Sequence, residues 1–356
     1  MFEFTATSFL IYYLLFSYLK MQNIMTKRQA TKWLIKYREI HFMAIFRIFT
    51  RLLIVLSFVY PAHVWAETPS VGVIYPEVRE PYRAVFMEII RGIEAGLNQS
   101  VKHYVLNGED SSAALLDHVR EDHVDVVISL GRAGLSATKQ FAEDFPVVIG
   151  AVMISPNQEV KGQTGITLAP DPDVLFARLK DIVPDAKEVS VVYDPRQKAW
   201  EIDRAIKVAK SYALTLNAFP SEDLHLSAEL YRKLLGQIKD GSVAIWLPLD
   251  NPAMDEQTLL PVVLQEAWEK NFVVFSGNLD HVRKGALFSL YPDNFGMGRS
   301  LATLALERLK KGASTTSTIN PLRDLLLAVN LRTAEHLGLR FASHDREQFD
   351  LVFPAP

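Results

Sequence analysis

The sequence has 356 residues, of which 49% are hydrophobic and 22% are charged. This balance is typical of folded globular proteins and excludes an intrinsically disordered chain, and the length is enough for one large or two moderate domains. The sequence contains no cysteine, which excludes structural disulfides, thiolate catalysis and lipid attachment to a cysteine.

The segment from residue 43 to residue 66 has the pattern of an export signal. It starts at Met43 with Arg47 and Arg51, and an apolar run follows over residues 52–60. A basic start, a short apolar run and a small residue at the end are the parts of a secretory signal. The apolar run is well short of the roughly 20 residues that span a bilayer. We therefore expect a signal peptide over residues 43–66 that is cleaved after Ala66.

A second apolar patch lies upstream, at residues 9–19, and a basic segment follows it. This patch is also too short for a membrane span. We expect translation to start at Met43 or Met25, which makes residues 1–42 an N-terminal extension ahead of the true start.

The exported part of the chain is acidic. Of the 38 basic and 41 acidic residues, the first 66 positions hold eight and two, which leaves 30 basic and 39 acidic residues and a net charge of about −9. Such a chain is a poor candidate for binding nucleic acid. Together with the signal and the missing cysteine, this predicts a soluble periplasmic protein that is not a lipoprotein.

From residue 70 onward, short runs rich in Val and Ile alternate with longer segments of helical period. The expected strands are SVGVIYP, VDVVISLG, FPVVIGAV, EVSVVYDP, SVAIWLPLD and NFVVFSG. Continuous apolar strands separated by helices indicate an α/β fold with parallel sheets covered on both faces. A break rich in Gly, Thr and Pro over residues 160–179 predicts a crossing between two such sheets.

Ligands of open parallel sheets bind beyond the carboxyl ends of the strands, in loops whose polar groups are free. The candidate ligand-binding residues in or next to these loops are Tyr75, Gly131, Arg132, Ala133, Gly134, Ser136, Met153, Tyr193, Asp250, Asn251, Gly277, Asn278 and Tyr291. The three tyrosines offer rings that stack on a flat or apolar ligand. Trp246 lies inside a predicted strand, and we expect it in the core.

Two of these loops have alternative interpretations. The turn from Gly131 to Gly134 lacks the Lys and the spacing of a phosphate-binding P-loop and is not a dinucleotide fingerprint. Its N–H groups, Arg132 and Ser136 suit a carboxylate, whereas the alternative is a tight turn with a solvated arginine. Asp250 and Asn251 either contact the ligand or cap a helix that begins near residue 255.

No catalytic or metal-binding pattern is present in the sequence. It lacks the Gly-x-Ser-x-Gly and His-Glu-x-x-His motifs. We expect His103, His123, His225 and His281 to be ordinary surface residues. Acid pairs such as Asp171/Asp173 and Glu222/Asp223 stand directly ahead of helical segments, where they are expected to cap helices. We therefore expect no catalytic residue, metal or cofactor, and a protein that is not an enzyme.

The chain resembles a known family. The segments VISLGRAGLSAT, PVVIGAVMISPN, GQTGITL and AIWLPLDNPAM, the long block over residues 273–312 and the segment AVNLRTAEHLGL occur in this order. They resemble the ABC-transporter substrate-binding proteins of the tryptophan/tyrosine-binding type, a branch of the type I periplasmic binding fold. The resemblance covers nearly all of residues 70–340.

This resemblance implies two Rossmann-like lobes that are joined by three crossings and close on a small molecule. The implied first lobe comprises residues 67–165 and 290–315, and the second comprises residues 166–289 and 316–356. Hinge residues are expected near Gly165, residues 288–291 and Asn320. The family usually has Gly-Thr-Pro-Ala at residues 131–134 and often Ser-Asp at residues 276–277, so the resemblance transfers the fold and not the identity of the ligand.

The resemblance also implies a partner in the membrane. The first hypothesis is that a monomer delivers an amino-acid-like or other small anionic or aromatic solute to an ABC permease with its ATPase. The second is that the closed form signals to a membrane sensor kinase or cyclase. A third hypothesis, outside the resemblance, is a hydrolase or another periplasmic enzyme.

Overall fold

The computed structural model describes residues 68–107, 112–139, 141, 145–155, 164–239, 241–311, 318–341 and 347–354. The predicted extension and signal peptide lie outside these residues. All the described residues belong to one of the two units into which the chain divides, Thr68–Pro356. Within the described ranges, no helix has the length and apolar character needed to cross a membrane.

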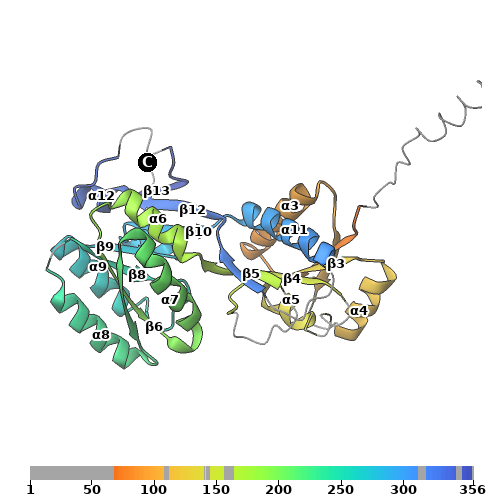
Figure 1. Cartoon of the computed structure of the whole chain (residues 1–356), viewed down its shortest axis with the longest axis horizontal. Coiled ribbons are helices and arrows are strands. Elements are labelled where there is room, and N and C mark those ends of the chain that lie inside the picture. The colour runs from red at the N-terminus through yellow and green to blue at the C-terminus, as the bar shows by residue number, and fades with distance from the viewer. Residues whose placement is uncertain are drawn as a thin grey trace, which may run out of the picture. The chain divides into compact units, whose positions relative to one another are not determined.

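The first sheet is entirely parallel, and its strand order is β11-β5-β4-β3-β1-β2 (Figure 1). Its strands are β1 (Val71–Pro76), β2 (Lys102–Leu106), β3 (Val126–Leu130), β4 (Val147–Val152), β5 (Thr164–Pro170) and β11 (Thr318–Leu322). Helices α3 (Tyr82–Leu97) and α11 (Asn294–Lys311) pack on one face. Helix α4 (Ser112–Glu121) and α5 (Gly131–Ala137) cover the other face, so both faces are buried as the continuous apolar strands require.

The second sheet has the order β13-β12-β10-β9-β8-β6-β7, and only the β10–β12 pair is antiparallel. Its strands are β6 (Glu188–Tyr193), β7 (Thr215–Pro220), β8 (Val243–Leu247), β9 (Val273–Ser276), β10 (Phe288–Pro292), β12 (Leu325–Asn330) and β13 (Leu351–Phe353). The helices around it are α6 (Pro172–Ile182), α7 (Pro195–Ala209), α8 (Leu224–Gln237), α9 (Leu259–Lys270), α10 (Leu279–Lys284) and α12 (Leu331–His336), with a short 3-10 turn, η2 (Lys210–Tyr212). The chain thus forms two mostly parallel sheets, each covered by helices on both faces, and this confirms the predicted fold class.

The core of the second sheet is aromatic. The Trp246 side chain is fully buried, as predicted, with its ring stacked 6.5 Å from the Phe275 ring and edge-on to Phe176 at 5.9 Å. Helices α6 and α7 cover this face, and α8 and α9 cover the other.

Aspartate side chains cap the first turns of two helices at the positions where the sequence predicts caps. The Asp171 carboxylate accepts the N–H of Asp173 at the start of α6, and the Asp223 carboxylate accepts the N–H of Leu226 at the start of α8. These bonds satisfy N–H groups that have no partner inside the helix. The predicted capping role of Asp171 and Asp223 is confirmed.

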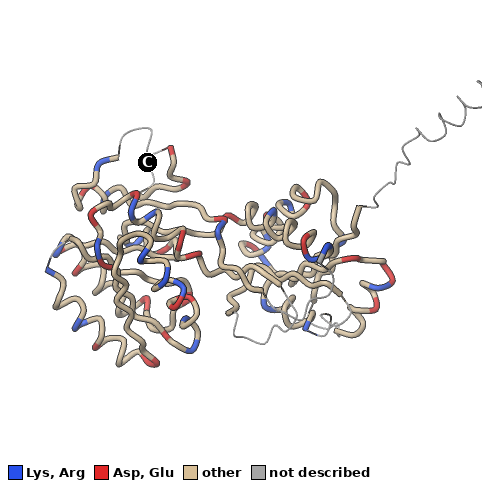
Figure 2. Tube along the Cα trace, in the orientation of Figure 1, with Lys and Arg blue, Asp and Glu red and all other residues tan. Residues whose placement is uncertain are grey.

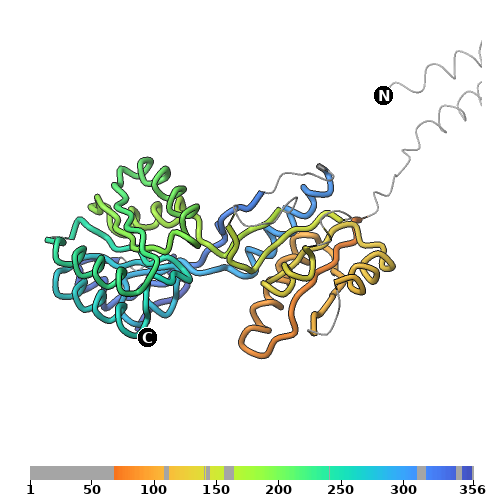
Figure 3. Tube along the Cα trace, turned by 90° about the horizontal axis from the view of Figure 1, so that it is seen from below, coloured from red at the N-terminus to blue at the C-terminus, as the bar shows by residue number. Residues whose placement is uncertain are grey.

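The chain passes between the two sheets three times (Figure 3). Strand β5 belongs to the first sheet through Pro170, β10 to the second sheet through Pro292, and β11 to the first sheet through Leu322. The crossings therefore follow these residues, whereas the boundaries expected from the sequence were 165/166, 289/290 and 315/316. The expected boundaries were those that the family resemblance implied, and a resemblance does not fix the residue at which each strand of this chain leaves its sheet. That the two sheets form separately closing lobes stays a prediction.

Acidic and basic residues are interspersed along the helices and loops around both sheets (Figure 2). This distribution agrees with an acidic chain that carries both signs on its surface.

Candidate functional site

A cavity of about 290 Å³ opens at the carboxyl end of β1. The residues that line it are Tyr75, Pro76, Glu77, Val78, Arg83, Phe86, Met87 and Val105. Tyr75 was predicted from its place at the end of a strand. Arg83, Phe86 and Met87 were missed, although their spacing within the first turns of α3 places them on one side of the helix.

Tyr75 is held by neighbouring rings. Its ring stacks on Phe86 at 6.4 Å and 27° and meets His103 edge-on at 6.0 Å, and its hydroxyl lies 3.4 Å from His103 Nδ1. Burial raises the pKa of Tyr75, an effect that the positive charge of Arg83 partly offsets, so the phenol stays neutral. The cavity thus combines neutral aromatic surface with one basic residue, Arg83, and one acidic residue, Glu77.

The Gly131 turn adjoins this cavity. Gly131 has φ +74°, and a Cβ at this position would lie 3.2 Å from the Phe86 ring, so the left-handed backbone and the close approach both require glycine. A Cβ on Gly134 would lie 2.9 Å from Ser129 Oγ, which makes this glycine a packing residue. Helix α5 begins directly at Gly131.

Three other predicted residues of this turn, Arg132, Ala133 and Ser136, are exposed. Within the described residues, the Arg132 guanidinium makes no hydrogen bond or ion pair, so it is available to a ligand or to solvent. Met153 is half-buried just beyond β4, where the neighbouring Ile154 N–H donates to Thr167 Oγ1 at 3.1 Å. The first sheet therefore presents Tyr75, the Gly131 turn and Met153 at one edge.

At the second sheet, the buried Asn251 side chain ties two loops together. Its amide donates to the Val192 carbonyl at 2.7 Å, and its Oδ1 accepts the Asp194 N–H at 3.2 Å. Helix α9 begins only at Leu259, so the alternative interpretation of Asp250 and Asn251 as its caps is wrong. The neighbouring Asp250 is exposed, and its backbone has the left-handed conformation, with φ +48°.

A buried lysine supports the same loop. Lys198 and Glu201 of α7 are each 1% exposed, with Lys198 Nζ 3.5 Å from Glu201 Oε2, and Lys198 donates a hydrogen bond to the Leu249 carbonyl. Burial raises the pKa of Glu201, and the charge of Lys198 opposes this shift. No sequence signal distinguishes this lysine from the exposed ones, because the acceptor lies 51 residues away. Two buried polar side chains, those of Lys198 and Asn251, therefore hold the Leu249–Asn251 loop in place.

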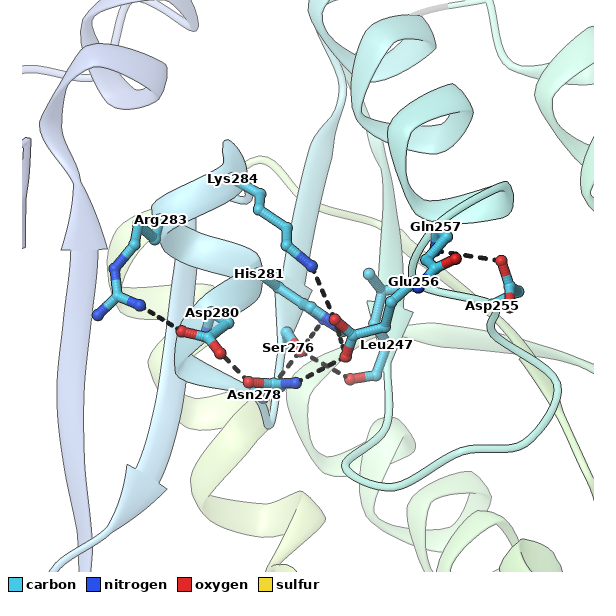
Figure 4. A network of polar contacts seen from close by, with 10 residues as sticks. All are labelled: Leu247, Asp255, Glu256, Gln257, Ser276, Asn278, Asp280, His281, Arg283 and Lys284. Carbon is cyan, nitrogen blue, oxygen red and sulfur yellow. Dashed lines mark hydrogen bonds and ion pairs between the residues drawn. The ribbon is translucent and has the colours of Figure 1, made fainter. Parts of the chain in front are cut away.

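A polar network surrounds His281 at the carboxyl ends of β8 and β9 (Figure 4). His281 Nδ1 lies 2.8 Å from Ser276 Oγ, and Nε2 lies 3.1 Å from Glu256 Oε1. Glu256 also accepts from Asn278 Nδ2 at 3.0 Å and Lys284 Nζ at 2.7 Å. The network joins the loop ahead of α9 to the start of α10.

The prediction that His281 is a surface residue is wrong, because its side chain is 3% exposed. His103, His123 and His225 are exposed as predicted. Burial lowers the pKa of His281, although the neighbouring Glu256 carboxylate partly counters this effect. The neutral imidazole fits with Nε2–H donating to Glu256, since a carboxylate only accepts.

Serine, histidine and carboxylate in this order also form the triad of hydrolases. Here Ser276 is completely buried, its Oγ lies 3.1 Å from the Leu247 carbonyl, and it accepts the Asn278 N–H at 2.9 Å. The hydroxyl is thus occupied inside the protein and is not presented to a substrate. The arrangement holds the loop Ser276–Asn278 in place.

The remaining predicted residues lie along the same edge of the second sheet. A Cβ on Gly277 would lie 3.0 Å from Leu249 Cβ, so the β8 and β9 loops touch there. Asn278 caps α10, its Oδ1 accepting the Asp280 N–H. Tyr193 and Tyr291 are half-buried at the ends of β6 and β10, and burial raises the pKa of both.

The structure thus groups the predicted residues into one set at each sheet. The first contains Tyr75, the Gly131 turn and Met153, and the second contains Tyr193, Asp250, Asn251, Gly277, Asn278 and Tyr291. Among the described residues, no cluster of three or more His, Asp or Glu side chains is arranged to hold a metal ion.

Several solved structures are similar to this chain, and those with a TM-score of 0.50 or more share its fold. A ligand-free, open substrate-binding protein with adhesive properties from Clostridium difficile is 16% identical, with a TM-score of 0.56 over 80% of this chain and 99% of that chain. A mutant XylFII–LytSN complex is 12% identical, with a TM-score of 0.50 over 73% and 97% of the two chains. The ABC domain in complex with L-Trp from Streptococcus pneumonia is 18% identical, with a TM-score of 0.46 over 80% and 100%.

At these identities the likeness concerns the fold alone. No curated protein matches this chain. Residues 87–344 match the sequence profile of the family described as ABC transporter substrate binding protein. This match extends over more than half of the chain and both sheets, and the protein therefore belongs to the ABC transporter substrate-binding protein family.

Proposed function

We propose that this protein captures a small solute between the carboxyl edges of its two sheets and delivers it to an ABC importer. The observation that carries the proposal is the aromatic cavity of Tyr75 and Phe86 next to the Gly131 turn, in which the following residue, Arg132, is exposed. It lies at the edge where open parallel sheets bind ligands. The family to which the chain belongs supports binding without chemical conversion.

The ligand class follows from the groups at the two edges. The rings of Tyr75 and Phe86 suit a flat or apolar moiety, while Arg83 and Arg132 suit a carboxylate. Asp250 on the second sheet offers an acceptor for an ammonium or hydroxyl group. An amino-acid-like or other small anionic, aromatic solute meets all three requirements.

The proposed mechanism is a shift between open and closed forms. A ligand that contacts both sheets favours the closed form by its difference in affinity for the two states, and a membrane partner then recognises the closed surface. In this proposal the protein acts as a periplasmic monomer after cleavage of the signal peptide. The hinge consists of the crossings after Pro170, Pro292 and Leu322.

The test begins with a thermal-shift screen of amino acids, aromatic acids, nucleosides and sugars. A ligand at a hundred times its Kd stabilises the native state by about 2.7 kcal/mol. The compound found is then titrated calorimetrically into the wild type, Arg132→Ala and Arg132→Lys. A charge-assisted pair predicts a roughly ten- to hundredfold loss for Arg132→Ala and a partial recovery for Arg132→Lys, which lacks the planar fork.

Arg232→Ala on α8 is the matched control, since it removes an exposed arginine far along the chain from the Gly131 turn. Its affinity is expected to equal that of the wild type. Equal affinities for Arg132→Ala and wild type would remove Arg132 from the site. Transport of the compound into vesicles that contain the importer separates delivery from signalling to a membrane sensor.

A further inference from the structure

A second hollow of about 510 Å³ lies beside the second sheet. Helix α10 leads from the carboxyl end of β9 back to the amino end of β10, and the antiparallel β12 finishes beside that end. Residues at the end of α10 and the start of α12 line this hollow together with one side of α9. We call it the α9–α12 groove. The ends of α10 and β12 place most of its lining away from the carboxyl edge, although Lys284 reaches Glu256 at that edge.

The α9–α12 groove is cationic. Its lining residues include Arg283, Lys284 and Arg332 but no Asp or Glu. Arg283 and Lys284 form ion pairs with Asp280 at 2.5 Å and Glu256 at 2.7 Å, but these side chains are 44–60% exposed. Exposed pairs contribute about 0–1 kcal/mol, so an acidic ligand can replace these partners at little cost in free energy. This charge contrasts with the net acidic chain around it.

Of the three basic residues, Arg332 is the one whose charge is not paired with an acidic side chain among the described residues. Its guanidinium lies 5.6 Å from the centre of the Trp268 ring. Trp268 is 40% exposed, yet its ring stacks on His336 at 3.6 Å and 7°, and His336 Nε2 lies 2.8 Å from the Trp268 carbonyl. The indole is therefore a rigid, partly exposed anchor beside a cation.

The shape and exposure of the groove favour a protein segment as its occupant. A small-molecule site encloses most of its ligand, whereas this groove is open along Trp268 and Arg283. A flat bilayer surface does not enter a hollow of about 510 Å³, whereas several side chains of a peptide do. Tryptophan and arginine are also the residue types that dominate binding energy at protein interfaces.

We propose that the α9–α12 groove binds an acidic segment of a partner protein. An apolar side chain of that segment packs against Leu264 and Trp268, which are partly exposed, and its carboxylates pair with Arg283, Lys284 and Arg332. Lys284 is linked to the solute edge through Glu256, which also accepts a hydrogen bond from Asn278, so the interaction is tested apart from the solute site at Arg332 and Trp268.

The experiment measures fluorescence anisotropy of labelled peptides that carry acidic residues around one central Leu or Phe. We expect saturable binding that weakens as salt is raised. Arg332→Glu is expected to lower the affinity at least tenfold, and Trp268→Ala to lower it similarly. Arg232→Glu on α8 reverses an exposed charge elsewhere and is expected to bind like the wild type.

Each variant is also titrated with the solute identified by thermal shift. Unchanged solute affinity in Arg332→Glu shows that the variant is folded and that any loss of peptide binding is local. Peptide binding that is equal in wild type and Arg332→Glu would overturn the proposal, as would equal binding of peptides in which Lys replaces the acids. A third outcome would overturn the proposal in favour of a membrane surface. In that outcome the wild type sediments with anionic phospholipid vesicles, Arg332→Glu does not, and no acidic peptide binds.

Discussion

His281 is a residue whose environment in the fold makes stability depend on pH. Its imidazole is surrounded by the Ser276 hydroxyl, the Glu256 carboxylate and, beyond it, the Lys284 ammonium, with Asp280 on the same helix. Burial lowers the pKa of His281 in the folded state, so the unfolded chain binds a proton more readily. Stability conferred by the neutral imidazole is therefore fully present above the unfolded pKa of about 6.5 and decreases as the pH falls through the range below it.

We predict that His281→Gln lowers the free energy of unfolding at neutral pH by about 1–3 kcal/mol, because buried polar partners lose a hydrogen bond. The variant should also show a shallower fall in stability between about pH 6.5 and pH 5, since glutamine does not titrate. Urea denaturation across this pH range measures both effects. Glu256 contributes separately and at lower pH, because the hydrogen bond from Lys284 lowers its pKa.

The control is His225→Gln, since the side chain of His225 is 87% exposed. It should leave both the stability and its pH slope close to those of the wild type. An unchanged slope in His281→Gln would show that His281 does not titrate differently in the folded and unfolded states.

Single residues differ in how far the sequence reveals their role. Trp246 and the caps Asp171 and Asp223 follow from local pattern, because a strand interior or a helix start is visible within a few positions. The burial of His281 and Lys198 depends on partners that are 25 and 51 residues away, which local pattern does not contain. The predicted ligand-binding residues gather at two sheet edges, but their contact with a ligand stays a prediction.

At the scale of elements, the contact between α3 and α11 depends on glycine. A Cβ on Gly298 would lie 2.1 Å from the Ile89 carbonyl oxygen, and a Cβ on Gly92 would lie 2.1 Å from the Phe295 carbonyl oxygen. Both neighbours are backbone atoms, which cannot turn away as a flexible side chain does. Gly298→Ala should therefore force the helices apart and lower the free energy of unfolding by about 1–3 kcal/mol.

Gly236→Ala in α8 is the matched substitution. A Cβ there meets no atom within 4 Å, so alanine should raise stability by about 0.4–1 kcal/mol by restricting the unfolded chain. Thermal and urea unfolding of both variants gives the comparison. If Gly298→Ala were as stable as the wild type, the close packing of α3 and α11 would be incorrect.

Burial decided only part of what was predictable, because the central strands β5, β10 and β12 are largely buried but were not among the predicted strands. The six apolar runs identified in the sequence form β1, β3, β4, β6, β8 and β9. Strands β2 and β7 were missed because they lie at sheet edges with largely exposed or half-buried side chains. Continuous hydrophobic runs occur only where both faces of a strand are covered.

At the scale of the whole molecule, the three crossings are bonded to one another. The Asp171 N–H donates to the Leu322 carbonyl at 2.8 Å, and the Asp293 N–H donates to the Asp324 carbonyl at 3.0 Å. Arg323 adds an ion pair with Asp171 at 2.7 Å. These bonds favour a motion in which the crossings bend together. Such concerted bending is what the proposed closure on a ligand requires.

Closure is tested most directly by a distance between the two sheets. Because the sequence has no cysteine, spin labels can be attached to Tyr82→Cys at the start of α3 and Glu222→Cys ahead of α8, both exposed and both at carboxyl edges. A pair within the second sheet unit, Glu222→Cys with Glu269→Cys on α9, is the control and should not change. Double electron–electron resonance with the screened solute is predicted to shift the first pair to shorter distances, with the same concentration dependence as binding. An unchanged distribution at saturating solute would contradict capture between the two sheets.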